Sequence, residues 1–457
     1  MIAASISRDI RSDDYREGVT TAMTLQADYG PAAGMPRASV IIPTYNRADM
    51  LRATLEALAA QTLPIGEYEV IVSDDGSSDD TRAVVESFSG RLRIKYHFQD
   101  DLGFRAATAR NAGARLASAP VLIFLDTGTL AGSDFVAAHL CAHDGAAGAG
   151  RAVIGYVHGY PPTKMEDPDF QVVQGMPDAV TRLSPEQVVA LYREEPSFRD
   201  SRHAELEKLG FDLSVRTVPE ELFWTSNCSV GTAAFWAVGG FDEDFRGWGM
   251  EDIDLGYRLA RNGASFHLSL DAWAVEMPHE RDDTGHFESS VKNVAMFLDK
   301  HQFTLPLLEI AWLMLLARER TMSTLEETNR MILDCALRCR DLEVGPLIEE
   351  EFARIPAGKR VAVFGAGPTV PASVPPSVLA DFDPQAVELL RAAGGHDVRY
   401  NVGIRTALPD GAVDVVVITP RLSGIWEQFG KAILAEADRI GAQTRCLFDA
   451  EVSSGVI

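Results

Sequence analysis

The stretch that decides the fold reads Ala38-Ser-Val-Ile-Ile-Pro-Thr-Tyr-Asn-Arg47, and Tyr68-Glu-Val-Ile-Val-Ser-Asp-Asp-Gly-Ser77 repeats its form farther along. Each is a short apolar strand that stops at a polar loop. Between them, residues 47–61 place apolar side chains at helical spacing, and further strands are expected at 92–98 and 120–125. Strands that alternate with helices predict an α/β fold whose parallel sheet is covered by helices.

The polar loops at the ends of these strands are the expected ligand site, because open α/β sheets bind ligands there. Asp74, Asp75 and Asp126 all follow predicted strands. Singly, such an aspartate more often caps a turn or a helix than binds a ligand. The case for a site therefore depends on several polar loops occurring in order, and six of them do: 43–47, 74–77, 103–113, 125–129, 239–255 and 277–281.

Length and charge narrow the functional classes. The chain has 457 residues, which suggests two or three domains, and a formal charge of −24, which disfavours nucleic acid or anionic membrane as a general partner. Its five cysteines follow no disulfide-framework spacing, and no stretch resembles a signal peptide or a clean membrane span. We therefore expect a cytoplasmic protein without a transmembrane segment.

Composition suggests four segments along the chain. Residues 1–36 are expected to be a flexible lead-in, and 37–286 a domain that contains the six loops. Residues 287–355 have mostly helical patterning and form an expected extension. A new strand pattern after a Pro- and Gly-containing linker marks a C-terminal domain at 356–457. Any self-association is expected to use the helical or the C-terminal domain.

The six loops together resemble glycosyltransferase family 2, whose members use nucleotide sugars and have the GT-A fold, a Rossmann-like mixed sheet covered by helices. The motifs PTYNR, DDGS and GFRAATARNAG carry this resemblance. The later element GWGMEDIDLGYRL resembles the galactosyltransferase-type C-terminal half of that fold. The resemblance covers residues 37–300 and implies a sugar transferase that acts on a nucleotide-sugar donor, with UDP as the expected nucleotide.

The resemblance assigns the donor side of the site. Asp75 stands where the family reads the nucleotide base, with Asp74 beside it and Asp126 at the end of the predicted strand at 120–125. Arg105, six residues before Asn111, has the family's spacing for an arginine that reaches the nucleotide, and a guanidinium suits phosphate or carbonyl groups. Three further residues are expected to wall the base and ribose: Pro43, Thr44 and Tyr45.

The resemblance also assigns the reaction. Inverting transfer needs a base that deprotonates the acceptor as it attacks the anomeric carbon, and Asp252 stands at the residue that the family uses. An acid at this position favours inversion. Glu251 is expected to bind or orient the acceptor, and Trp248 to offer a face for a sugar ring. Asn227 is assigned to the sugar or acceptor as well.

A divalent metal, Mn²⁺ or Mg²⁺, is expected by resemblance, although one ligand is missing. The family motif is Asp-x-Asp, and this chain has Asp126-Thr127-Gly128. Asp126 and His279 remain as candidate metal ligands, and Thr129 could add an oxygen. Restoring the acid by Gly128→Asp is expected to tighten metal binding if the loop keeps the family geometry. The alternative is that cationic side chains, Arg105 or Arg281, and helix N-termini stabilise the leaving group without metal.

The C-terminal domain resembles a small Rossmann-type unit, with Gly365-Ala-Gly367 after a strand and Asp381 after the next. Four prolines between residues 367 and 379 leave no room for the usual first helix, so we expect a degenerate domain. Two rival hypotheses remain at this point. One is a non-catalytic binding or scaffold protein on a decayed transferase fold, and the other is a bifunctional transferase whose tail binds a ligand.

Overall fold

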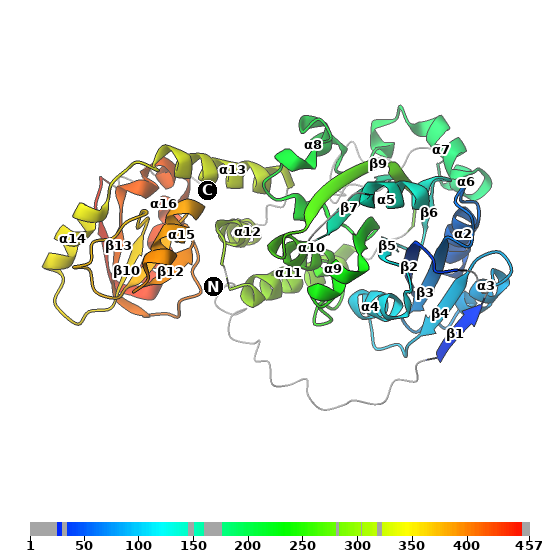
Figure 1. Cartoon of the computed structure of the whole chain (residues 1–457), viewed down its shortest axis with the longest axis horizontal. Coiled ribbons are helices and arrows are strands. Elements are labelled where there is room, and N and C mark those ends of the chain that lie inside the picture. Colours follow the sequence, from blue (N-terminus) through cyan, green and yellow to red (C-terminus); the bar gives the residue numbers. More distant parts are fainter. Residues whose placement is uncertain are drawn as a thin grey trace. The chain divides into compact units, whose positions relative to one another are not determined.

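The computed structural model describes residues 25–29, 34–144, 150–159, 176–279, 283–302, 304–317 and 322–449. The chain folds into two compact units, residues 1–293 and 294–457. Their elements can be followed by colour in Figure 1. None of the helices within the described ranges combines the length and apolar character that crossing a bilayer requires.

The first unit is built on a nine-stranded mixed sheet with the order β1-β4-β3-β2-β5-β8-β7-β9-β6. Strands β4, β3, β2 and β5 run parallel, whereas β8 is antiparallel to β5 and to β7. The strands are β1 (Leu25–Tyr29), β2 (Ala38–Thr44), β3 (Tyr68–Asp74), β4 (Ile94–Phe98), β5 (Val121–Leu125), β6 (Thr129–Ala131), β7 (Arg151–His158), β8 (Asn227–Gly231) and β9 (Ser265–Glu276).

Helices cover both faces of this sheet. Residues Val40 and Ile42 of β2 join a buried core with Leu51 and Leu55 of the first helix, whereas on the other face Gly113 lets a helix approach β2 and β3 closely. The helices are α2 (Ala48–Ala59), α3 (Thr81–Ser87), α4 (Ala106–Leu116), α5 (Phe135–His143), α6 (Met176–Arg182), α7 (Pro185–Tyr192), α8 (His203–Lys208), α9 (Thr232–Ala237), α10 (Glu251–Arg261) and α11 (Asp283–Lys300).

Two features of this unit were not expected from the sequence. The lead-in contains a strand, β1, which pairs antiparallel with the edge strand β4 from Leu25 opposite Phe98 to Tyr29 opposite Ile94. The expected lead-in thus contains a strand at residues 25–29, where the β4 edge offers open backbone groups to pair with. The segment at 196–222 also contains three short 3-10 helices, Pro196–Phe198, Leu213–Val215 and Pro219–Leu222.

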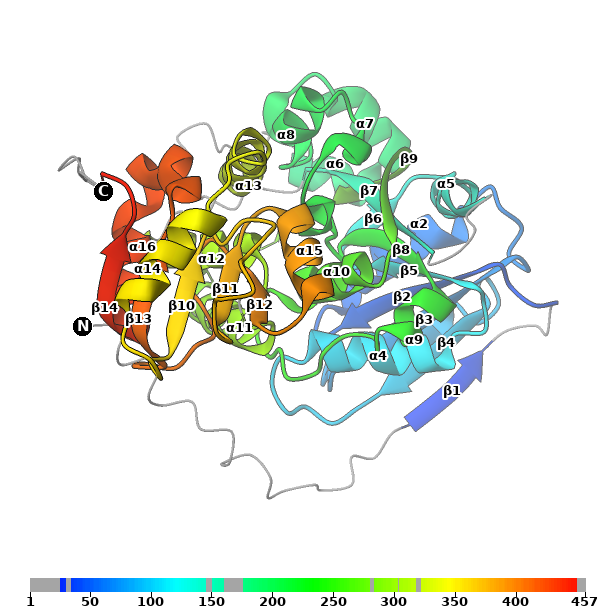
Figure 2. The same cartoon turned by 60° about the vertical axis from the view of Figure 1, so that its left-hand side comes forward.

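The second unit contains a five-stranded parallel sheet with the order β12-β11-β10-β13-β14, which Figure 2 shows side by side. The sequence predicted a Rossmann-type unit here, and the parallel sheet has the strand order of that fold. Its elements are α12 (Pro306–Ala317), α13 (Met322–Arg338), α14 (Gly345–Arg354), β10 (Val361–Phe364), β11 (Val378–Asp381), α15 (Pro384–Ala393), β12 (Asp397–Tyr400), β13 (Val413–Ile418), a 3-10 helix (Pro420–Ile425), α16 (Trp426–Ile440) and β14 (Gly441–Cys446). Helices α12 and α13 thus share a unit with this sheet, although the sequence suggested a break at residue 356.

The carboxyl end of this sheet is filled by the protein's own side chains. Asp381, at the end of β11, accepts a hydrogen bond from the Gly367 amide at 2.8 Å and pairs with Arg421, whose Nε lies 3.0 Å from its Oδ2. Both side chains of this pair are fully buried. The Arg421 guanidinium also donates to the carbonyl oxygen of Cys339 at 2.5 Å. An acid that would face a ligand in other Rossmann-type sheets is thus engaged internally.

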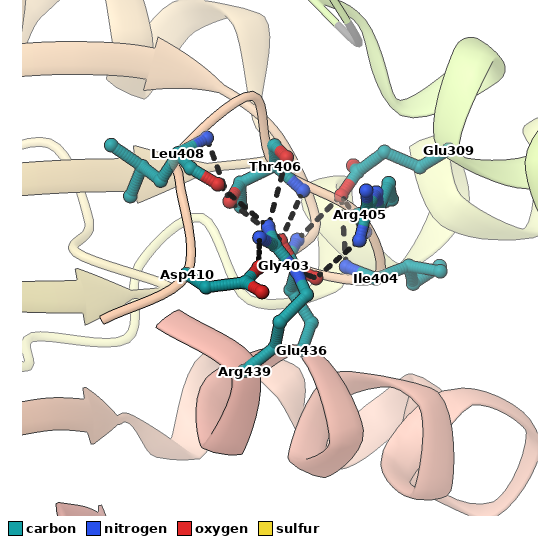
Figure 3. A network of polar contacts seen from close by, with 9 residues as sticks. All are labelled: Glu309, Gly403, Ile404, Arg405, Thr406, Leu408, Asp410, Glu436 and Arg439. Atoms are coloured by element: carbon teal, nitrogen blue, oxygen red, sulfur yellow. Dashed lines mark hydrogen bonds and ion pairs between the residues drawn. The ribbon is translucent and has the colours of Figure 1, made fainter. Parts of the chain in front are cut away.

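A buried carboxylate of α12 is bound by the loop that follows β12 (Figure 3). Glu309 is fully buried and accepts the backbone N–H of Val402 on Oε2 at 2.5 Å. Its Oε1 accepts the N–H groups of Gly403, Ile404 and Arg405 at 2.9, 2.8 and 3.0 Å. These four bonds lower the pKa of Glu309, but burial outweighs them and raises it to about 8. Helix α12 is thereby fixed to the sheet of the second unit.

Candidate active site

Asp75, expected on the donor side of the site, accepts hydrogen bonds through both of its carboxylate oxygens. It follows β3, is 6% exposed, and accepts Gln99 Nε2 at 2.6 Å and the Arg105 guanidinium at 2.9 Å, both on Oδ1. The Arg105 backbone N–H donates to Oδ2 at 2.7 Å. Burial raises the pKa of Asp75, and the bonds from Gln99 and Arg105 oppose this rise. The sequence predicted Asp75 and Arg105, but nothing in it identified Gln99 as their partner.

The other residues expected on the donor side have different degrees of exposure. Asp74 accepts the amides of the following turn and the Tyr96 hydroxyl, at 2.7 Å, so its carboxylate holds the loop in shape. Tyr45 is 45% exposed and donates its hydroxyl to Asp101 at 2.7 Å. Thr44 is buried, and the carbonyl oxygen of Pro43 accepts the Thr127 hydroxyl at 2.8 Å. An exposed ring at Tyr45 suits stacking on a base.

The acceptor side begins at the loop before α10, and this loop has unusual backbone geometry. Gly247 and Gly249 have φ of 75° and 94°, and Met250, directly before the helix, has φ of 79°. A left-handed conformation is strained for a residue with a side chain, and Met250 provides no side-chain cap to the helix. Contacts from α11 hold the loop, because Asn293 Nδ2 donates to the Gly249 carbonyl at 2.8 Å and Ser289 Oγ accepts the Trp248 N–H at 3.0 Å.

Two neighbouring carboxylates, Glu251 and Asp252, open α10. Burial, and then the charge of Glu251, raise the pKa of Asp252 to about 7, while Arg110 and the N–H groups of Ile253 and Thr225 lower it. A carboxylate with a pKa near neutrality is an effective general base at physiological pH. The Oε2 atom of Glu251 is buried and accepts no hydrogen bond from the part of the chain that the structure describes.

Arg110 connects the two sides of the site, and the sequence did not identify it. From α4, its guanidinium donates to Asp126 Oδ1 at 2.8 Å and to Glu251 Oε1 at 3.0 Å. Its side chain is only 5% exposed. Burial alone would lower the pKa of Arg110, but the charges of Asp126 and Glu251 outweigh this effect and raise it. The only available signal was an arginine in an alanine-rich helix that also contains Arg115, and this pattern does not reveal which arginine is paired or with what.

The loop that replaces the family's second aspartate is closely packed. Gly128 has φ of 92°, and a Cβ atom there would lie 2.2 Å from the Cε of Met50. Its N–H donates to Thr54 Oγ1 at 2.9 Å, and its carbonyl accepts the Met277 N–H at 2.8 Å. The expectation that Gly128→Asp would simply restore a metal ligand is therefore not supported, because the new side chain meets both a strained backbone and an occupied space.

The two candidate metal ligands follow different strands: Asp126 comes after β5, and His279 comes after β9. The Asp126 side chain is 38% exposed and bonds to Arg110 through one oxygen. His279 Nδ1 lies 3.0 Å from the Met277 carbonyl oxygen and 3.6 Å from Glu276 Oε1. A hydrogen bond from Nδ1 to a carbonyl oxygen gives Nε2 the lone pair that a metal requires. Within the described residues, no three His, Cys, Asp or Glu side chains form a ready metal cluster, and Arg281 lies outside them.

The buried side chains of Thr129 and Asn227 form hydrogen bonds to other strands of the sheet. Thr129 is fully buried and donates to Glu276 at 3.4 Å, a contact that the sequence did not suggest. Asn227 is also fully buried. Its Nδ2 donates to the carbonyl oxygens of Ala272 and Tyr156 at 2.8 and 3.2 Å, and its Oδ1 lies 2.9 Å from His139 Nε2. These contacts tie β8 to its neighbours, so we do not carry Asn227 forward as a sugar-binding residue.

Comparison with known proteins identifies the family. The sequence profile described as Glycosyl transferase family 2 matches residues 39–130. Validoxylamine A glucosyltransferase of Streptomyces hygroscopicus subsp. jinggangensis is 42% identical over 425 residues, which cover 90% of this chain and 97% of that protein. The chain belongs to glycosyltransferase family 2. Its sheet and helices are those of the GT-A fold expected from the sequence, and it transfers a sugar from a nucleotide-sugar donor.

Other comparisons cover parts of this family 2 glycosyltransferase. A profile described as N-terminal domain of galactosyltransferase matches residues 202–286, which contain α10. Chondroitin synthase of Escherichia coli is 31% identical, over 57% of this chain and 37% of that protein. A solved mannosyltransferase of Pyrobaculum calidifontis, in complex with GDP-Man and Mn²⁺, has a TM-score of 0.39 at 21% identity, and the match covers 59% of this chain and 64% of that one.

Proposed function

We propose that this glycosyltransferase inverts the anomeric configuration of its donor and that Asp252 is the general base. The observation that carries the proposal is the environment of Asp252 at the start of α10, where burial and Glu251 raise its pKa to about 7. At neutral pH such a carboxylate can take a proton from an acceptor hydroxyl as that oxygen attacks the anomeric carbon. Glu251, with a buried oxygen that has no partner in the described chain, is the proposed acceptor for a second substrate hydroxyl.

The donor is proposed to lie against Asp75 and Tyr45. Asp75 Oδ2 accepts one hydrogen bond, from the Arg105 amide, and so retains acceptor capacity for the N–H of a pyrimidine base. We propose UDP as the nucleotide and glucose as the sugar. The relatives named validoxylamine A glucosyltransferases support glucose as the sugar and validoxylamine A as the acceptor.

A divalent cation is proposed to bind together with the donor diphosphate. Asp126, through the oxygen that Arg110 does not engage, and His279, through Nε2, would hold it. When bound, the cation would supply positive charge for the leaving diphosphate. With two protein ligands, it should bind weakly without nucleotide, and an imidazole ligand favours Mn²⁺ over Mg²⁺. The C-terminal unit is proposed to carry out no second reaction, which the internal pairing of Asp381 with Arg421 supports.

The test is an assay with the full chain, UDP-, GDP- and dTDP-glucose as donors, and validoxylamine A as acceptor probe. The anomeric proton of the product, followed by NMR from the start of the reaction, should show the β configuration from an α-linked donor. Asp252→Asn should bind donor but lose about 10²–10⁴-fold in turnover. A product with retained configuration, or near wild-type turnover by Asp252→Asn, would refute the proposal.

A further inference from the structure

Arg110 is a buried charge that neither the donor side nor the acceptor side of the site explains alone. It lies on α4, whereas its partners Asp126 and Glu251 follow β5 and begin α10. Arginine is almost never fully buried unless it is paired. Here one guanidinium pairs with two carboxylates that are distant in sequence, using a separate nitrogen for each, NH2 at 2.8 Å and NH1 at 3.0 Å. A planar guanidinium can fix two such partners at once.

The start of α10 depends on this pairing. The helix is preceded by Met250, which follows Gly249, has a left-handed conformation and provides no side-chain cap. The carboxylate of Glu251, the first residue of the helix, is the group that ties its first turn to α4. Asp252 is the next residue, so a shift of Glu251 would move the proposed base with it. Removal of one partner from a buried pair also leaves the remaining charges uncompensated.

We propose that Arg110 is a positioning residue for sugar transfer, which holds Asp126 on the donor side and the Glu251–Asp252 turn on the acceptor side in a fixed relation. This inference rests on the proposed role of Asp252. Arg110 does not take part in base recognition, since Asp75 is bound by Gln99 and Arg105 instead. Its loss should therefore affect turnover rather than donor affinity.

Arg110→Ala should lower kcat by about 10²-fold or more, the scale expected when catalytic groups are displaced by about 1 Å. The KM for the donor should stay within about threefold, because Asp75 and its partners are intact. Arg110→Lys should retain partial activity, since an ammonium group carries the charge but is a single point that cannot fork to both carboxylates. Donor binding to each variant can be measured by calorimetry with UDP.

Chemical rescue separates positioning from a general loss of structure. Millimolar guanidinium chloride, well below denaturing concentration, should restore turnover of Arg110→Ala in a saturable manner by occupying the vacated space between the carboxylates. The matched control is Arg115→Ala, on the same helix, where the side chain is 57% exposed and pairs with Glu243 at 3.2 Å. That variant should keep wild-type kcat and show no response to guanidinium.

Wild-type kcat in Arg110→Ala, or a donor KM that rises as much as kcat falls, would overturn the inference, and the latter would make Arg110 a donor ligand. Absence of guanidinium rescue in a folded Arg110→Ala would overturn it as well. If Arg110→Ala does not fold, the kcat of Arg110→Lys is the test. An unchanged kcat in Arg110→Lys would overturn the inference, because it would show that one side chain need not bond both carboxylates at once. Full turnover by Asp252→Asn would instead refute the proposed function, whatever the Arg110 variants do.

Discussion

Replacing the proposed base should make the protein more stable while it destroys activity. The pKa of Asp252 is raised from 3.8 to about 7 in the folded state. Between these values the folded protein keeps a proton that the unfolded chain has lost, so stability falls as pH rises through this window and the loss is complete above about pH 7. A shift of about 3 units at 1.36 kcal/mol each gives about 4 kcal/mol, and partial exposure of the side chain reduces this to about 2–4 kcal/mol.

Asp252→Asn removes this penalty because the amide carries no charge, and its oxygen can still accept the Ile253 N–H, now bonded at 2.8 Å. The variant should therefore be about 2–4 kcal/mol more stable than wild type at pH 8 and equal to it near pH 4. Thermal unfolding at several pH values between 4 and 8 measures the difference. Asp49→Asn, on the exposed face of α2, is the control and should show no such trend. A destabilised Asp252→Asn at pH 8, or a difference that does not change with pH, would refute the reasoning.

Three further predictions concern other parts of the molecule. Gly128→Asp should lower the melting temperature and leave Mn²⁺ affinity no tighter in calorimetry, since the backbone is left-handed there; tighter binding would contradict this. Glu309→Gln should destabilise the second unit by about 1–3 kcal/mol in denaturant unfolding, because the amide nitrogen of Gln cannot accept the Val402 N–H and leaves that buried donor without an acceptor. An unchanged transition would count against it. The full chain should not bind S-adenosylmethionine at micromolar concentration, since Arg421 occupies Asp381, and saturable binding in calorimetry would disprove this.

Sequence patterns predicted where the candidate site residues lie on strands and helices, because those positions depend on local rules. Asp75 and Asp126 follow buried strands and Asp252 opens a helix, because apolar runs, turn residues and helix periodicity are local signals. The ordered motifs then gave the family and the fold, and the comparisons confirmed both.

Contacts between distant segments were not predictable in this way. Arg110 and Glu251 are 141 residues apart, and no spacing rule relates them. The sequence assigned Asn227 to the sugar or acceptor, whereas the side-chain N–H groups of Asn227 donate to backbone carbonyl oxygens inside the sheet. Strand β1 pairs with the edge strand β4, a partner that a window on residues 25–29 cannot show.

The binding of Glu309 by the loop after β12 has a consequence for how this chain can be divided. The natural place to cut, judged by composition, is the linker near residue 356, yet that cut removes α12 and leaves the amides of residues 402–405 without their acceptor. The smallest C-terminal segment that keeps these contacts therefore begins near residue 294, where the second unit starts. Chimeras that exchange C-terminal units between relatives should therefore carry α12 together with the sheet. Recombination inside the linker would separate Glu309 from the loop amides that it binds.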